Sequence, residues 1–209
     1  MINTTRRTLM LSSAALAFAN LGALAEDAKT VDLTDLLTPP AEGDMTMGPD
    51  TAKVTIVEYA SASCPHCAAF NNEQFGKLKM DYIDTGKVKF IFREFPHNDQ
   101  AMAAFMVARC SPKEKYFPLI DIFFKTQQKW VPDAFVQLKD IAKQTGMAEA
   151  DFEACLKNEK VAKAIFEVRD KADKSYGVTG IPTFFINGKT YDGERTYDAM
   201  KAFIDPLLK

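Results

Sequence analysis

Two cysteines stand three positions apart in the run Cys64-Pro65-His66-Cys67, a spacing typical of thiol–disulfide exchange. That chemistry needs a thiolate that attacks and later leaves. Pro65 suits the first position of a helix, where its missing N–H costs nothing. We therefore expect Cys64 at a helix N-terminus, where unpaired N–H groups and the helix dipole lower its pKa. Cys67 is expected to be the shielded, resolving thiol, and His66 to favour the Cys64 thiolate further.

Three other interpretations of this motif were weighed against exchange. Attachment of haem requires a histidine directly after the second cysteine, and Ala68 stands there instead. A zinc site usually needs four ligands, whereas the motif offers two sulfurs and at most His66. A purely structural Cys64–Cys67 disulfide would close too small a loop to stabilise the fold much. The residue types favour exchange, and no metal site is expected.

Glu58 and Pro182 are two further residues that could take part in the chemistry. Glu58 lies six residues before Cys64 in a short β-branched run. It is either a solvent-facing strand residue or a buried carboxylate whose raised pKa would let it exchange protons near neutral pH. Pro182 follows Ile181 just before another apolar run. It is either an ordinary trans proline at a strand start or a cis proline that exposes the backbone of residue 181.

The elements that must position these residues form a βαβ unit, a helical stretch and a ββα unit. The expected elements are strand 54–59, helix 65–84, strand 88–95, helices between 98 and 176, a hairpin at 183–191 with a two-residue turn, and helix 197–208. The first strand, helix and second strand have the lengths of a parallel βαβ unit. This order predicts an α/β protein.

Apolar residues recur three and four positions apart through the helical stretch, and we interpret them as core packing rather than a cofactor site. The stripes are Met102, Phe105, Met106 and Arg109; Ile120, Phe123, Phe124 and Gln127; Phe135, Leu138, Ile141 and Ala142; and Val161, Ala164, Ile165, Val168 and Ala172. Trp130 is also assigned to packing. His97 is assigned to a surface or capping position, because its distance in the chain from Cys64 gives no sign of catalysis.

The composition is that of a soluble globular protein. The chain has 209 residues, of which 47% are hydrophobic and 26% charged, and this excludes intrinsic disorder. The formal net charge is −2 and no basic block is present, so nucleic acid is not an expected partner.

The first 25 residues have the order of a cleavable secretory signal. Arg6-Arg7 precede a broken apolar stretch that ends in Ala23-Leu24-Ala25. A membrane anchor is the alternative, but the stretch is short and its small-residue ending fits cleavage better. The arginine pair also resembles a twin-arginine signal. Export to the periplasm, an oxidising compartment, is therefore expected.

The remaining chain divides by composition and pattern. Residues 26–52 are expected to be an N-terminal arm with a short helix at 31–37 and a turn-rich lead-in. Residues 53–96 and 178–209 supply the sheet, and residues 97–177 form an inserted all-helical domain.

This arrangement resembles a thioredoxin fold interrupted by a helical domain. Glu58, the Cys64–Cys67 motif and the run from Gly180 to Gly188 (Gly-Ile-Pro-Thr-Phe-Phe-Ile-Asn-Gly) make residues 50–209 similar to the DsbA-type periplasmic thiol–disulfide oxidoreductases. The resemblance implies that the acid at Glu58 exchanges protons with Cys67.

The same resemblance implies roles for residues 180–182. It implies a cis Ile181-Pro182 bond that, with Gly180, presents a backbone platform beside the cysteines. An extended client chain would pair with this platform through main-chain hydrogen bonds.

Cys110 and Cys155 look most like the second cysteine pair found in one group of these bacterial proteins. Each lies on an apolar helical face, one near Met106 and the other near Phe152, so both are expected to point into the helical core. Two separate buried thiols are the alternative. In an oxidising compartment we expect a structural disulfide that is buried and inert.

The expected function is oxidation of cysteine pairs in exported, unfolded proteins by a Cys64–Cys67 disulfide. The resemblance implies reoxidation by a DsbB-like membrane quinone reductase and no dissociable cofactor. A monomer is expected, because the arm is short and holds Pro39-Pro40. The alternatives are an isomerase or reductase kept reduced by another donor, or a periplasmic metal-binding or copper-tolerance protein.

Overall fold

A computed structural model describes residues 31–209, and at its centre lies a five-stranded mixed sheet. The strands are β1 (Met45–Met47), β2 (Val54–Ala60), β3 (Val88–Glu94), β4 (Thr183–Ile186) and β5 (Lys189–Thr190). Their spatial order is β1-β3-β2-β4-β5; β2 and β3 are parallel, and the other neighbours are antiparallel. The signal peptide expected over residues 1–25, with its arginine pair, lies outside the described residues.

The parallel pair β2 and β3 is buried on both faces, which explains why both sequences are almost continuously apolar. Ile56 and Phe90 belong to the larger hydrophobic core on one face of the sheet. Val57 and Tyr59 belong to a smaller cluster on the other face. Since side chains alternate along a strand, Glu58 shares the face of Ile56, and the structure buries it there with only 4% of its surface exposed.

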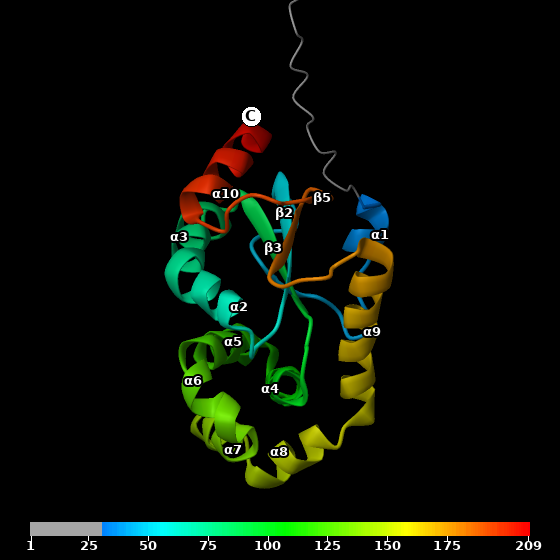
Figure 1. The fold of residues 1–209 in the computed structure, drawn as a ribbon, viewed down its shortest axis with the longest axis vertical. Coiled ribbons are helices and arrows are strands. Elements are labelled where there is room, and N and C mark those ends of the chain that lie inside the picture. The colour runs from blue at the N-terminus through cyan, green and yellow to red at the C-terminus, as the bar shows by residue number, and fades with distance from the viewer. Residues whose placement is uncertain (1–30) are drawn as a thin grey trace, which may run out of the picture.

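Helices cover both faces of the sheet. They are α1 (Leu33–Leu37), α2 (Pro65–Phe70), α3 (Gly76–Leu78), α9 (Glu159–Tyr176) and α10 (Tyr197–Ile204), with π-helical segments at Asn71–Phe75 and Lys79–Ile83. α2, α3 and α10 lie on one face, and α1 and α9 lie on the other (Figure 1). The helix expected over 65–84 is thus one continuous stretch, although its hydrogen bonding changes twice to the π type.

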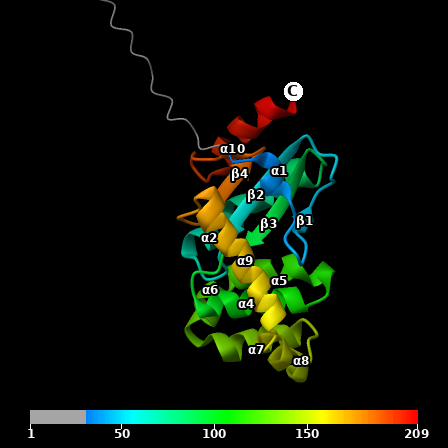
Figure 2. The same ribbon diagram turned by 90° about the vertical axis from the view of Figure 1, so that its right-hand side faces the viewer.

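Five helices gather at one end of the sheet, beyond the ends of β2 and β3 (Figure 2). They are α4 (Asp99–Cys110), α5 (Tyr116–Lys125), α6 (Gln127–Trp130), α7 (Ala134–Gln144) and α8 (Glu149–Leu156). Trp130 is fully buried here, and its indole N–H donates to the carbonyl of Phe123 (2.7 Å). Phe135 departs from its expected stripe and is 55% exposed. No helix within residues 31–209 is long and apolar enough to cross a membrane.

The return to the sheet ends in the expected hairpin. Asn187 and Gly188 connect β4 to β5, and both have positive φ angles, 47° and 81°. Two successive left-handed residues make the type I′ turn, which asparagine followed by glycine adopts readily. The predicted thioredoxin-like fold with helices inserted between its two halves is therefore confirmed.

The edge strand β1 is the one strand that the sequence does not predict. Its three residues are too few to display an alternating pattern, and it exists because Met45 to Met47 pair antiparallel with Phe92 to Phe90 of β3. Gly48 makes this close approach feasible. It has a φ of 80°, and a Cβ there would lie 2.2 Å from the carbonyl oxygen of Val88. The expected arm thus contributes to the sheet.

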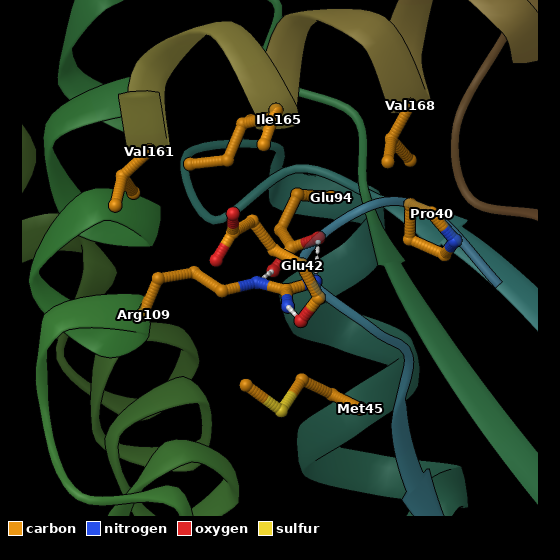
Figure 3. A pocket seen from close by; sticks show the side chains of 9 residues that line it. Pro40, Glu42, Met45, Glu94, Arg109, Val161, Ile165 and Val168 are labelled. Carbon is orange, nitrogen blue, oxygen red and sulfur yellow. Dashed lines mark hydrogen bonds and ion pairs between the residues drawn. The ribbon is translucent and has the colours of Figure 1, made fainter. Parts of the chain in front are cut away.

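Two buried arginines hold this segment in place. Arg93 of β3 pairs with Asp44 (2.9 Å), and Arg109 of α4 pairs with Glu94 at the end of β3 (2.8 Å; Figure 3). Arg109 also donates to the carbonyl of Gly43 (2.9 Å). Several hydrogen bonds for each guanidinium offset the desolvation of the buried charges. The result is a polar joint between the N-terminal segment, the sheet and the inserted helices.

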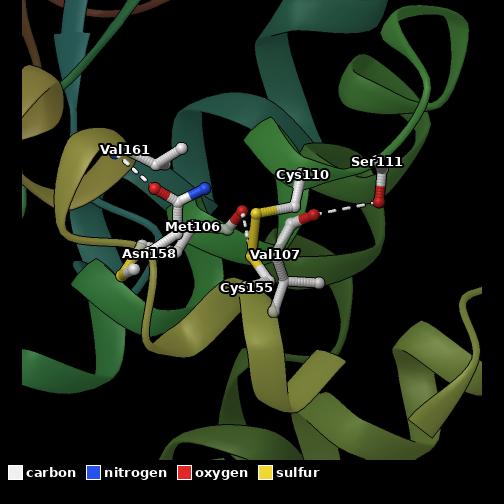
Figure 4. Close-up of a disulfide and its surroundings, with 7 residues drawn as sticks. All are labelled: Met106, Val107, Cys110, Ser111, Cys155, Asn158 and Val161. Atoms are coloured by element: carbon white, nitrogen blue, oxygen red, sulfur yellow. Dashed lines mark hydrogen bonds between the residues drawn. A yellow bond between two sulfur atoms is a disulfide. The ribbon is translucent and has the colours of Figure 1, made fainter. Parts of the chain in front are cut away.

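A disulfide joins Cys110 at the end of α4 to Cys155 in α8, with their Cα atoms 6.0 Å apart (Figure 4). Cys155 is buried, as expected, but Cys110 is only partly buried. The bond borders a surface cavity of about 420 Å³ that Lys115 and Asn158 also line. Both cysteines meet at the same hydrophobic core, as expected, and Cys110 packs against it from its edge, because α4 ends there and the chain turns away at Ser111.

Replacing both Cys110 and Cys155 with alanine should destabilise the protein. The disulfide closes a loop of 45 residues, for which the chain-entropy model gives roughly 4 kcal/mol. Urea unfolding of the double variant and of the wild type, each with Cys64–Cys67 oxidised, measures this difference. Equal unfolding midpoints, or two alkylatable thiols at positions 110 and 155 of the native protein, would contradict it.

Candidate active site

Cys64 occupies the N-cap of α2, and Pro65 takes the first helical position. The backbone of Cys64 is extended (φ −84°, ψ 123°), so the chain enters the helix at this residue. Both Cys64 and Cys67 are free thiols, with 6% and 0% of their surface exposed. The sulfur nearer to solvent is therefore that of Cys64, although it is more buried than its expected role as the exposed thiol suggests.

The two thiols have opposite electrostatic environments. The pKa of Cys64 is lowered to about 5 by a hydrogen bond from the Cys67 thiol and by backbone N–H groups of Cys67 and His66, with a further contribution from the charge of His97. Burial raises the pKa of Cys67 far above its usual value, and the neighbouring Cys64 and Glu58 raise it further. The helix start thus stabilises a thiolate at one sulfur and a thiol at the other.

His66 acts on Cys64 through its backbone. Its amide N–H is among the groups that lower the pKa of Cys64. Its imidazole is exposed and makes no hydrogen bond to any residue from 31 to 209. The contribution of His66 to Cys64 is therefore that of its backbone N–H.

Glu58 lies under the cysteines on β2 with no hydrogen-bond partner among residues 31–209. Burial raises the pKa of its carboxyl to about 8. The carboxyl lines a cavity of about 420 Å³ whose other walls include Phe75, Phe92 and Phe117. A buried acid that is protonated near neutral pH and acts electrostatically on Cys67 is a group that can exchange a proton with that thiol.

The Ile181-Pro182 peptide bond is cis. The carbonyl oxygen of Ile181 lies 3.8 Å from the sulfur of Cys64, so this segment faces the reactive thiol. Gly180 is exposed, Ile181 is half-buried and Pro182 is buried. The carbonyl of Gly180 accepts from Thr183 (2.6 Å). Residues 180–182, far from Cys64 in the chain, are thus placed directly beside it.

The structure brings two residues to the site that the sequence argument set aside. His97 contacts Ser61 (Nδ1 to Oγ, 2.8 Å) and is close enough for its charge to act on Cys64. The signal was present, because parallel neighbours end at the same edge of a sheet and His97 follows β3 as Ser61 follows β2. Gln127, assigned to a packing stripe, donates to the carbonyls of Ala62 (2.8 Å) and Cys64 (3.0 Å). No spacing in the sequence indicates that contact.

Comparison with known proteins agrees with this fold and site. A family model described as thioredoxin matches residues 40–206, and the chain belongs to this family. Within it, the inserted helices and the dithiol at a helix start are those of the DsbA-like group.

Three matches define the similarity more closely. A protein-disulfide oxidoreductase of Rickettsia bellii is 35% identical over 171 residues, 80% of this chain and 66% of the relative. Disulfide bond formation protein D of Bacillus subtilis is 29% identical over 181 residues, 82% of this chain and 80% of the relative. The crystal structure of Wolbachia pipientis alpha-DsbA1 matches with a TM-score of 0.78 and 29% identity, covering 85% of this chain and 96% of that chain. The matches span under two thirds of the rickettsial proteins' lengths, 55% to 66%.

Within residues 31–209 no group of three or more His, Cys, Asp or Glu side chains is arranged to hold a metal ion.

Alkylation of the reduced protein should label Cys64 at acidic pH. Because its pKa is lowered to about 5, the rate of iodoacetamide labelling at Cys64, followed by peptide mass, should reach half its maximum near that pH. In the Cys64→Ser variant, Cys67 should stay unlabelled up to pH 8. A half-maximum above pH 8, the range of an ordinary cysteine, would contradict the lowered pKa.

Glu58→Gln should remove a pH dependence of stability. The folded pKa of about 8 exceeds the ordinary value of 4.5, so the native state holds its proton where the unfolded state has lost it. The wild-type free energy of unfolding should therefore fall as pH rises from 4.5 to 8, by about 1.4 kcal/mol per pH unit relative to the variant. Urea unfolding of the oxidised proteins measures this. Exposed Glu73→Gln is the control, and parallel curves for wild type and Glu58→Gln would contradict burial of the acid.

Proposed function

We propose that this protein catalyses thiol–disulfide exchange and acts as a dithiol oxidase on cysteine pairs of other proteins. The observation that carries the proposal is the contrast between the two sulfurs. A hydrogen bond from the Cys67 thiol, together with backbone N–H groups at the start of α2, lowers the pKa of Cys64 to about 5, while burial keeps Cys67 protonated. A stabilised Cys64 thiolate stabilises the reduced enzyme, which makes the Cys64–Cys67 disulfide an oxidant.

The reaction begins on the oxidised enzyme. A client thiolate attacks the sulfur of Cys64, the S–S bond to Cys67 breaks, and the electron pair leaves on Cys67. Cys67 takes up a proton, because its buried thiolate is unfavourable. A second client thiolate then attacks the client sulfur of the mixed disulfide and expels Cys64 as a thiolate. The client has lost two electrons and two protons, and the enzyme has become a dithiol.

Glu58 is the proposed proton donor to Cys67. Its carboxyl is protonated near neutral pH because burial raises its pKa to about 8. It also lines a cavity, through which its own proton can be replaced. In reoxidation the same carboxylate would accept the proton of Cys67, which makes that thiol a nucleophile.

The cis-proline segment is the proposed client platform. Ile181 faces the sulfur of Cys64, so a chain laid along residues 180–182 would bring its own sulfur to the reactive atom. Binding through main-chain hydrogen bonds is tolerant of sequence. Clients are therefore expected to be unfolded or extended proteins with reduced cysteines.

The cellular setting proposed here follows the same chemistry. An oxidase needs an electron acceptor, and we propose a DsbB-like membrane quinone reductase. We place the protein in the periplasm, after export and cleavage following residue 25, and propose that it works as a monomer. A monomer suits an oxidase better than an isomerase, which has to hold a misfolded client between several sites.

Cysteine variants test the proposed sequence of steps. Cys67→Ser, with Cys64 first converted to its mixed disulfide with glutathione, should accumulate a disulfide-linked complex with a reduced, unfolded client that carries one cysteine. The client thiolate attacks the sulfur of Cys64 and releases glutathione, and the resolving thiol is absent; Cys64→Ser treated in the same way should form none. Non-reducing electrophoresis with the client detects the complex. Oxidative refolding of a reduced client, compared with refolding of a scrambled one, separates oxidase from isomerase. Faster rescue of the scrambled client, or Cys64→Ser with wild-type activity, would overturn the proposal.

A further inference from the structure

The loop Ser61–Ser63 connects the end of β2 to Cys64, and it is held from outside the sheet. The hydroxyl of Ser61 bonds to His97 (2.8 Å), and the hydroxyl of Ser63 donates to Asn98 (2.9 Å). The carbonyl of Ala62 accepts from Gln127 (2.8 Å). All three partners come from the stretch that begins after β3 and forms the inserted helices. Each loop residue is therefore tied to that insertion.

Gln127 makes the deepest of these contacts. It is the first residue of α6, and only 8% of its surface is exposed. Its side-chain nitrogen donates both hydrogens, one to the carbonyl of Ala62 and one to that of Cys64 (3.0 Å). Within residues 31–209 the Ala62 carbonyl accepts from no other residue, and a buried carbonyl left unpaired is costly. Gln127 is thus the group that supplies this carbonyl with a hydrogen bond.

The carbonyl of Cys64 accepts two hydrogen bonds, one from within α2 and one from the inserted helices. It accepts from the N–H of Ala68 (3.0 Å), which is the first hydrogen bond of α2, and from Gln127. The N–H of Cys64 donates to Ser61 (3.0 Å), which closes the loop on itself. The orientation of this peptide group decides how the first turn of α2 directs its free N–H groups at the sulfur. Gln127 holds that orientation from the insertion.

We propose that Gln127 is a positioning residue through which the inserted helical domain fixes the loop in front of Cys64 and keeps the first N–H groups of α2 directed at its sulfur. Its side chain carries no charge, so its action is geometric. The titratable groups around the two sulfurs are Cys67, His66, His97 and Glu58, and Gln127 is not one of them. Asn98 and His97 hold the same loop through the hydroxyls of Ser63 and Ser61.

Gln127→Met provides the direct test. Methionine has a similar length and volume but no hydrogen-bond donor. The pKa of Cys64, followed by the ultraviolet absorbance of the thiolate, should rise by about one unit. The equilibrium with glutathione at pH 7 should shift about tenfold toward the disulfide form of the enzyme, because the reduced form loses thiolate stabilisation. Exposed Gln128→Met, the next residue on the same helix, is the matched control and should change neither value.

A merely structural role would lower the melting temperature and leave these two values unchanged, and that result overturns the proposal. If Gln127→Met does not fold, Gln127→Asn replaces it: both donors and the zero charge remain, but the shorter side chain cannot reach both carbonyls. A Cys64 pKa still near 5 in that variant would equally overturn it. The thiolate titration needs no client, so the outcome is separate from that of the proposed oxidase activity.

Discussion

The hydrogen bonding of the Cys64 sulfur by the start of α2 is the interaction on which the rest of the site depends. A helix begins with N–H groups that have no partner within the helix, and here those of His66 and Cys67, after the Cys67 thiol, lower the pKa of Cys64. The interaction favours the thiolate, so it acts on acidity, on leaving-group quality and on the balance between dithiol and disulfide together. The position of Cys64 at the helix N-cap therefore makes its thiol more acidic than that of Cys67.

Burial supplies the other half of the asymmetry. Cys67 lies one turn into the helix with no exposed surface, and below it Glu58 is buried on the central strand. The Glu58 carboxylate would repel a Cys67 thiolate, which raises the cost of ionising Cys67, while burial raises the pKa of Glu58 itself. The Glu58 carboxyl therefore keeps its proton near neutral pH, where the proposed reaction would pass it to Cys67. The cavity lined by Glu58 keeps this carboxyl from being fully enclosed by the protein.

Much of this architecture is predictable from local patterns. The strands, the long helix after Cys64 and the Asn187-Gly188 hairpin each have strong sequence signals, and the cysteine motif identifies the reactive atom. β1 escapes prediction because three residues show no periodicity and long-range pairing creates the strand. The partial exposure of Cys110 depends on where a helix stops. His97 could have been found from topology, since parallel strands end together, but Gln127 follows two intervening helices and its aim toward Cys64 is set only by tertiary packing.

The placement of the insertion then has a physical logic. Parallel pairing puts Ala60 beside Glu94, so the chain leaving β3 emerges next to the loop that leads to Cys64. Helices inserted at that point can reach the loop with polar side chains, while most of the buried side chains of β2 and β3 stay apolar. The buried pairing of Arg109 with Glu94 fixes the first inserted helix to the end of the same strand. Movement of the insertion relative to the sheet would therefore move the loop before Cys64. The geometry of the reactive thiol thus depends on how firmly the inserted helices are fixed to the sheet.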